Sequence, residues 1–303
     1  MQNGAWRVID CTNLEGRLKY ARGRLLVSQY ETGETSEIPL AQIAVLLVGQ
    51  RSNCSTALLY ELAQYGVSVL ICDWRGIPVS ALHSWCDTPT IVTQRHRAQV
   101  SMSLPRQKNA WKKIIQAKIY GQAHCLELIG DEQAGTLFEL AKQVRSGDIS
   151  NAEGTAARFY WSRVFESGFR RKPGSGIGKN SLLDYAYAVL RGHVIRAIIT
   201  AGLSPVFGVS HHNRSNYYCL ADDLIEPYRP AIDHEVYQLP ETATLEDPLV
   251  KKHLVNATNL QFAQSGSTIP SSLTEFAQQF GLYCEGRIKS LSVPRFGEFN
   301  EER

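Results

Sequence analysis

The stretch 182-LLDYAYAVLRGHVIRAIIT-200 predicts a long helix, and this helix decides how the second part of the chain folds. Its apolar residues recur at spacings of three and four, Asn180 or Ser181 can cap its start, and Gly202 can end it. At the rise of an α-helix, a segment of this length spans about 28 Å, which is enough to cross a domain. We therefore expect a helical domain to be built around it.

Near residue 90, the pattern of apolar residues changes from one typical of short strands to one typical of helices. Helices are predicted over 93–103, 108–129, 136–143 and 152–166. Strands are predicted over 6–10, 17–20, 24–29, 35–39, 43–48, 67–72 and 78–83, with one helix over 55–65. The sequence thus predicts an α+β fold, in which a small β-rich N-terminal domain (residues 1–88) precedes a larger, all-helical domain (residues 89–303).

Composition limits the class of protein more than its function. The chain has 303 residues, a net charge of +3 and 44% hydrophobic residues, which is typical of a globular protein. It has no apolar segment near the roughly 18 residues of a membrane span and no signal-peptide pattern, so we expect a cytoplasmic protein with no membrane association. The seven cysteines show no C-x-x-C pair, which argues against a structural zinc site.

Basic residues gather in groups along the chain. The groups fall within residues 95–118, 163–179, 251–253 and 287–295. Several basic patches on a nearly neutral chain suit a polyanion that wraps around the protein. The alternative is a set of solvated surfaces, and composition alone leaves both open.

The segment 208-GVSHHNRSNYYCLADDLIEPYRP-230 combines imidazoles with carboxylates. These side chains are His211, His212, Asp222, Asp223 and Glu226. Together they form a ligand set for a divalent metal that works on oxygen chemistry, including the activation of phosphates. Residues 221–226 can form a helical turn that ends at Pro227 and places an aspartate and Glu226 on one face. The alternative is a solvated acidic turn in which Asp222 or Asp223 forms a salt bridge with Arg229.

Glu153 occupies the first turn of the predicted helix 152–166, which Asn151 can cap. A carboxylate is favoured there by the helix dipole alone, so its presence has a purely structural explanation. The functional alternative is that Glu153 is a third metal ligand.

The loop 168-GFRRKPGSGIGKNS-181 is rich in glycine and basic residues. A phosphate-binding P-loop needs glycine where Pro173 stands and serine or threonine where Asn180 stands. We therefore interpret it as a flexible link before the helix over 182–200.

Ordered motifs run along nearly the whole chain. In the helical part they are Glu153-Gly154, 157-ARFYW-161, 182-LLDYAY-187, 202-GLSP-205, 211-HHN-213 and 220-LADDLIEPYRP-230. Earlier in the chain they are 38-IPL-40, 69-VLICD-73, 76-GIPV-79 and 106-RQKNAWKKIIQAKIYGQA-123. These motifs resemble the CRISPR-associated adaptation integrase, the nuclease-integrase of spacer acquisition, and look most similar to its type II branch.

The resemblance implies a catalytic metal site in the helical domain. The matching ligands are Glu153, His211 and Glu226, which would hold Mg²⁺ or Mn²⁺, and Asp223 matches a further acidic position near the metal. His211 is preferred to His212 because the family histidine ends a Gly-x-x-His pattern. We also expect DNA phosphate contacts from four basic residues: Arg163, Arg170, Arg171 and Lys252.

The resemblance further implies a homodimer whose β-rich domain mediates dimerisation, and which joins the small partner protein of the adaptation complex and other type II CRISPR proteins. Its substrates would be double-stranded DNA, namely the prespacer and the CRISPR repeat, joined by 3′-hydroxyl transesterification. Two alternatives stay open. One is a metal nuclease that does not join DNA, and the other is a non-catalytic nucleic-acid-binding module with a structural acidic cluster.

Overall fold

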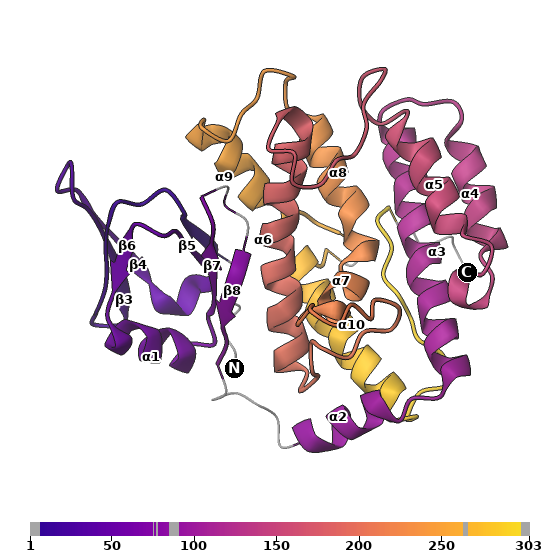
Figure 1. Ribbon diagram of the computed structural model, residues 1–303, viewed down its shortest axis with the longest axis horizontal. Coiled ribbons are helices and arrows are strands. Elements are labelled where there is room, and N and C mark those ends of the chain that lie inside the picture. Colours follow the sequence, from indigo (N-terminus) through magenta and orange to yellow (C-terminus); the bar gives the residue numbers. More distant parts are fainter. Residues whose placement is uncertain (1–6, 75, 77, 85–90, 263–265, 298–303) are drawn as a thin grey trace. The chain divides into compact units, whose positions relative to one another are not determined.

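The computed structural model describes residues 7–74, 76, 78–84, 91–262 and 266–297. The chain divides into two compact units, Met1–Pro89 and Thr90–Arg303 (Figure 1). The first is strand-rich and the second is helical. The domain boundary predicted between residues 88 and 89 lies outside the described residues.

Within its described residues, the first unit contains two four-stranded sheets and one α-helix. One sheet has the order β1 (Arg7–Cys11), β5 (Ile43–Val48), β7 (Ser68–Cys72) and β8 (Pro78–Leu82). The other has the order β4 (Thr35–Pro39), β3 (Arg24–Gln29), β2 (Gly16–Ala21) and β6 (Ser52–Cys54). The helix α1 (Thr56–Gln64) is capped by Ser55, and a short 3₁₀ turn, η1 (Leu40–Gln42), precedes β5.

The sequence of β5 explains its central place. All of its residues are apolar and buried, and it pairs in parallel with β1 on one side and β7 on the other. A continuous apolar run is what a parallel strand covered on both faces requires. Leu58 and Leu62 of α1 pack into the core beside Leu46 of β5.

Each predicted strand is present within the described residues, and its ends differ from the predicted ends by at most one residue. The first strand begins at Arg7 within the described residues, whereas Trp6, its predicted first residue, lies outside them. The strand β6 was not predicted because its three residues, Ser-Asn-Cys, carry no alternating apolar pattern. It is held by parallel pairing with β2, which a local pattern cannot reveal.

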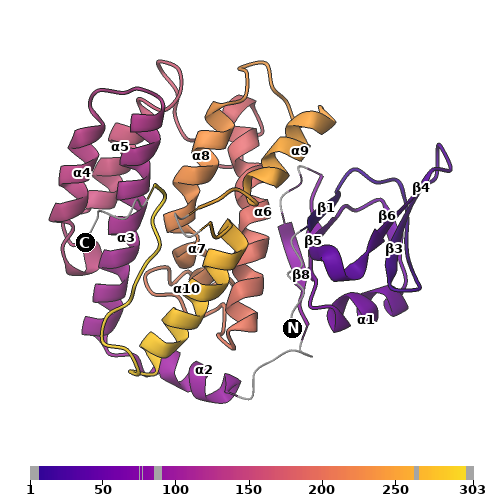
Figure 2. The ribbon, with the colours of Figure 1, turned by 180° about the vertical axis from the view of Figure 1, so that it is seen from behind.

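The second unit is built around two long helices, α3 and α6 (Figure 2). Its α-helices are α2 (Val92–Val100), α3 (Leu104–Leu128), α4 (Ala134–Gln143), α5 (Ala152–Trp161), α6 (Gly178–Thr200), α7 (Cys219–Leu224), α8 (Arg229–Tyr237), α9 (Pro248–Ala257) and α10 (Ile269–Cys284). Two 3₁₀ turns are η2 (Ser146–Asp148) and η3 (Glu226–Tyr228). Helix α3 packs against α4, α5, α8 and η3, and α6 packs against α7, α8, α9 and α10. No helix in the described ranges has both the length and the hydropathy to cross a bilayer.

Proline explains most of the helices that the sequence prediction missed. Helices α8, α9 and α10 were not predicted, and each carries a proline in its first turn: Pro230, Pro248 and Pro270. The N–H groups in the first turn of a helix have no partner within the helix, so proline, which lacks an N–H, is tolerated there. Proline can therefore start a helix as well as end one. For the same reason α3 begins at Leu104, with Pro105 in its first turn, rather than at residue 108.

Three further helix limits were predicted wrongly. Helix α2 ends at Val100 rather than at residue 103, and α5 ends at Trp161 rather than at residue 166. Helix α6 begins at Gly178 after Ile177, so neither Asn180 nor Ser181 caps it. Asn180 instead stabilises the preceding loop, where its Oδ1 accepts the backbone N–H of Lys172 at 2.7 Å.

A buried polar network ties the helices of the second unit together. The carboxylate of Asp233 in α8 is 1% exposed and accepts hydrogen bonds from the hydroxyls of Tyr160 in α5, at 3.0 Å, and Tyr187 in α6. The Tyr160 hydroxyl also lies 3.2 Å from Cys125 Sγ of α3. Burial raises the pKa of Asp233 to about 7, although the tyrosine hydrogen bonds act to lower it.

This network should make stability depend on pH. The pKa of Asp233 rises on folding from 3.8, so folding takes up a proton, and the free energy of unfolding should fall as pH rises from about 4 to about 7. The loss should approach about 1.4 kcal/mol per pH unit. Urea unfolding at pH 5.5 and 7.5 should show a weaker pH dependence for Asp233→Asn, which mimics the protonated acid. Equal pH dependence in both proteins would contradict this assignment.

Candidate metal centre

Glu153 is held by a tightly bonded helix start. Asn151, in the left-handed region with φ of 50°, accepts the N–H of Gly154, and Asp148 accepts the N–H groups of Ala152 at 2.8 Å and Glu153 at 3.1 Å. An added Cβ at Gly154 would lie 2.7 Å from Asn151 Oδ1, so this cap requires a glycine. The predicted cap is thus confirmed. Because Asp148 and Asn151 accept the backbone N–H groups at this helix start, the Glu153 carboxylate is not needed as a cap and can contact a side chain of α3.

Glu226 starts η3 and is buried, with 5% of its surface exposed. Its Oε1 lies 3.0 Å from Nε of Arg229, whose guanidinium stacks 4.5 Å above the centre of the Tyr187 ring. Burial acts to raise the pKa of Glu226, but the charges of Arg229 and Lys118 outweigh it, so the pKa lies below its ordinary value. Glu226 is therefore an ionised carboxylate inside the protein.

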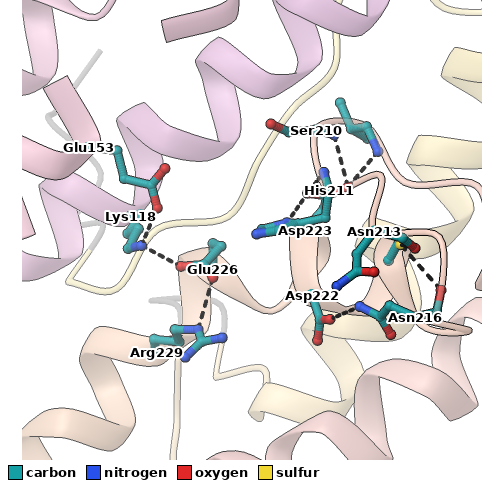
Figure 3. A network of polar contacts seen from close by, with 12 residues as sticks. Lys118, Glu153, Ser210, His211, Asn213, Asn216, Asp222, Asp223, Glu226 and Arg229 are labelled. Atoms are coloured by element: carbon teal, nitrogen blue, oxygen red, sulfur yellow. Dashed lines mark hydrogen bonds and ion pairs between the residues drawn. The ribbon is translucent and has the colours of Figure 1, made fainter. Parts of the chain in front are cut away.

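Lys118 of α3 joins the two glutamates, as Figure 3 shows. Its Nζ lies 2.6 Å from Glu153 Oε1 and 2.6 Å from Glu226 Oε2. Burial acts to lower the pKa of Lys118, but the two carboxylates raise it overall. Sequence reasoning missed this residue. Two carboxylates from α5 and η3, which are remote in sequence, therefore converge on one cation position.

His211 is fixed through Asp223, which is fully buried. Asp223 Oδ1 lies 2.7 Å from His211 Nδ1 and 3.2 Å from the His211 backbone nitrogen, and Oδ2 accepts the N–H groups of Val209 and Ser210 (Figure 3). The hydrogen bond to Asp223 is the main cause that raises the pKa of His211. Since Nδ1 is engaged, Nε2 is the atom of His211 that can bind a metal.

Two neighbours explain why the chain presents His211 in this way. An added Cβ at Gly208 would lie 2.3 Å from the His211 carbonyl oxygen and 2.9 Å from Asp223 Oδ2, so the turn needs a glycine. Trp111 of α3 packs edge-on against the imidazole, with ring centres 5.8 Å apart. Trp111 and Lys118 are seven residues apart on α3, which places them on one face two helical turns apart. Sequence reasoning missed Trp111 as well.

The other acid and histidine of the segment have separate surroundings. Asp222 forms an ion pair of 2.9 Å with Arg191 and accepts a hydrogen bond of 2.6 Å from Asn216 Nδ2, which closes the loop before α7. His212 is exposed. The alternative in which Arg229 pairs with Asp222 or Asp223 is wrong, because Arg229 pairs with Glu226.

The residues fit a divalent ion by type and by charge. Glu153 and Glu226 already share a cation position, and the charges of His211 and Glu226 shift each other's pKa, which places both in one electrostatic site. Glu226 Oε2 is buried, and its partner is the Lys118 ammonium at 2.6 Å. Carboxylate oxygens with one imidazole suit Mg²⁺ or Mn²⁺. Within the described residues, no three acidic, histidine or cysteine side chains lie close enough to hold an ion without rearrangement.

The four residues expected to contact DNA fall into two classes. Arg163 pairs with Asp131 at 3.2 Å and lies over the Phe159 ring, and Arg171 pairs with Asp184. Arg170 and Lys252 are exposed. The first two are thus engaged within the protein, whereas the latter two present their charge to solvent.

The glycine-rich loop has no phosphate-binding geometry. Lys179 is buried, and its Nζ donates to the carbonyl of Val236 at 3.1 Å and pairs with Glu241 at 3.3 Å. This lysine satisfies the end of α8, where a cation also complements the helix dipole. The interpretation of the loop as a link rather than a P-loop agrees with this contact.

Comparison with known proteins gives matches over most of the chain. The sequence profile of the family described as CRISPR associated protein Cas1 matches residues 11–254. A CRISPR-associated endonuclease Cas1 from Neisseria meningitidis serogroup C (strain 8013) is 35% identical over 269 residues, covering 85% of this chain and 84% of the relative. A CRISPR-associated endonuclease Cas1 from Pyrobaculum aerophilum is 28% identical over 257 residues, covering 79% and 84%.

Solved structures share the fold. A casposase bound to integration product superposes with a TM-score of 0.79 at 22% identity and covers 98% of this chain and 95% of its own. A CAS1 protein from Thermotoga maritima gives a TM-score of 0.74 at 16% identity and covers 97% and 100%. At these identities the likeness establishes the arrangement of helices and strands and nothing finer.

Proposed function

Because the chain belongs to the CRISPR-associated Cas1 family, we propose that it is a metal-dependent DNA nuclease and integrase that inserts short duplexes into a CRISPR array. The observation that carries the proposal is the convergence of Glu153 and Glu226 on one cation position, where the charge of His211 also acts to lower the pKa of Glu226. The endonuclease names of the relatives, and the integration product bound in the casposase structure, support the same chemistry.

The chemistry is an exchange of phosphodiesters without a covalent protein intermediate. A 3′-hydroxyl of the incoming duplex attacks a phosphodiester at the repeat edge, and the leaving 3′-oxygen is released. A divalent ion, when bound, polarises the phosphoryl oxygen and offsets the charge that develops on it. Glu153, Glu226 and Nε2 of His211 would hold that ion.

Other residues of the chain orient these groups. Asp223 fixes the His211 ring through Nδ1, and Arg229 holds Glu226 through Oε1. Trp111 limits rotation of the imidazole from the α3 side. The exposed Arg170 and Lys252 are the basic residues best placed to meet DNA phosphates, whereas Arg163 and Arg171 would first have to leave their acidic partners.

The proposed partners follow from family membership. A Cas6-RT-Cas1–Cas2 complex contains a chain region that superposes with a TM-score of 0.74 and covers 99% of this chain. By analogy, this protein would act as a homodimer with a small partner of the Cas2 kind, on a prespacer duplex and a CRISPR repeat. Assignment to the type II branch stays a prediction from the resemblance of the chain as a whole.

Metal removal tests this function directly. A labelled duplex with 3′-hydroxyl ends, a plasmid that carries a CRISPR repeat and the purified protein with its small partner should give joined products in Mn²⁺ or Mg²⁺. EDTA should abolish joining, and excess Mn²⁺ should restore it, because the carboxylates alone supply no electrophile for the phosphate.

The products separate the alternatives. A nuclease without integrase activity would shorten the duplex in the presence of metal but leave no label on the plasmid. A non-catalytic binding module would retain DNA equally with Mn²⁺ and with EDTA and would give neither product. Joining that persists in EDTA would contradict the metal-dependent mechanism.

A further inference from the structure

The ammonium of Lys118 has the surroundings of a bound cation. Its Nζ lies at the same distance, 2.6 Å, from one carboxylate oxygen of Glu153 and one of Glu226. The side chain is largely buried, with 13% exposed, and reaches from α3 into the space between α5 and η3. A positive charge therefore already stands between the two glutamates proposed as metal ligands.

The need for this charge follows from burial. Glu226 has 6% of its side chain exposed, and a buried carboxylate without a counter-charge strongly destabilises a protein. Glu153 adds a second negative charge at the same place. A chain that folds before it binds metal thus requires an internal cation here.

Of the two cations beside Glu226, Lys118 is the one that can leave. Arg229 is a planar group that binds the other oxygen of Glu226 at 3.0 Å and stacks on the Tyr187 ring. Lys118 is a point charge on a flexible four-carbon stem, so rotation of its side chain can withdraw the ammonium without moving α3.

We propose that Lys118 is a built-in counter-ion that occupies the cation position between Glu153 and Glu226 in the metal-free protein and is displaced by the divalent ion. The inference rests on the proposed metal-binding function of these glutamates. It gives Lys118 two effects: it stabilises the metal-free fold, and it competes with the metal and so lowers its affinity. Neither effect follows from the ligand set alone.

Replacement of Lys118 should separate these effects. In calorimetric titrations of the full chain with Mn²⁺, without DNA, Lys118→Met should bind Mn²⁺ about tenfold more tightly than the wild type. In EDTA the same variant should have a lower Tm, and Mn²⁺ should raise its Tm by more than that of the wild type. Lys112→Met is the matched control, because position 112 lies about 120° around α3 from position 118. Unchanged or weaker Mn²⁺ binding by Lys118→Met would overturn the proposal.

A second measurement uses the wild-type protein and does not depend on a variant that folds. Acetylation with an amine reagent, followed by mass spectrometry, should modify Lys118 faster in saturating Mn²⁺ than in EDTA, whereas Lys112 should react equally in both. A rate at Lys118 that stays the same or falls would contradict displacement.

Glu153→Gln distinguishes failure of this inference from failure of the proposed function. If the wild type binds Mn²⁺ and Glu153→Gln weakens that binding, the metal site stands and the Lys118 measurements decide the inference alone. If Glu153→Gln leaves Mn²⁺ affinity unchanged, the ion binds elsewhere, and both the proposed site and the role of Lys118 are wrong.

Discussion

Glu226→Gln should abolish the joining of a labelled duplex to a repeat-bearing plasmid, with a loss of at least about 10²-fold at saturating metal. A divalent ion stabilises the transition-state charge by several kcal/mol, and each 1.4 kcal/mol corresponds to about tenfold in rate. Glutamine keeps the shape of Glu226 and an oxygen for Arg229, but it removes the charge that Lys118 or a metal requires. The measurement is the initial rate of joining in Mn²⁺.

The controls separate loss of chemistry from loss of fold. Glu139→Gln makes the same chemical change at an exposed ion pair with Lys142 on α4 and should leave joining unaffected. The Tm of Glu226→Gln in EDTA should show that the protein is folded. Glu153→Ala and His211→Ala should also abolish joining. Near-normal joining by any of these three variants, with metal present, would remove that residue from the mechanism.

The strand-rich unit was largely predictable because its signals are local. The strands Arg24–Gln29, Thr35–Pro39 and Ile43–Val48 have the predicted bounds, since turn residues bracket each apolar or alternating run. The strand Ser52–Cys54 escaped prediction because its stability comes from pairing with β2, which is distant in sequence. A local sequence pattern shows which secondary structure a segment prefers. Where that preference is weak, pairing with a neighbouring strand decides whether the segment becomes a strand.

The helical unit was predicted less completely, because proline can begin a helix as well as end one. Pro227 suggested that the helical turn ends there, yet η3 begins at Glu226 and α8 begins at Arg229, each with a proline in its first turn. This affects the candidate site, because the first residue of α8 is Arg229, which pairs with Glu226. Helix starts at proline are thus the main information that the sequence interpretation lacked.

The sequence pointed to the candidate metal ligands but not to the residues that surround them. Imidazole and carboxylate residue types pointed to a metal, and the resemblance selected Glu153, His211 and Glu226. Lys118 was counted only among the basic residues of the group within 95–118, and Trp111 appeared only within the motif 106–123. Their seven-residue spacing shows that they share a face of α3, but only the fold brings that face to Glu226 and His211.

Asp223 is where the structure adds most to the sequence interpretation. It was expected as a further acidic position near the metal, yet each of its carboxylate oxygens accepts hydrogen bonds from the turn that carries His211. In the proposed site it would therefore act on the metal through His211, as a positioning residue. Loss of such a partner costs about 10–100-fold in metal affinity or activity.

Asp223→Asn should therefore lower joining by about 10–100-fold and also shift the titration of His211. An amide nitrogen cannot accept the N–H groups of Val209 and Ser210, so the turn should loosen. The carboxylate hydrogen bond raises the pKa of His211, so the pKa should fall in the variant, as followed by NMR and assigned with His211→Gln. Asp222→Asn, which leaves these bonds in place, should keep the pKa of His211 raised. A merely structural Asp223 would reduce Tm and joining without moving that pKa, and this result would contradict the positioning role.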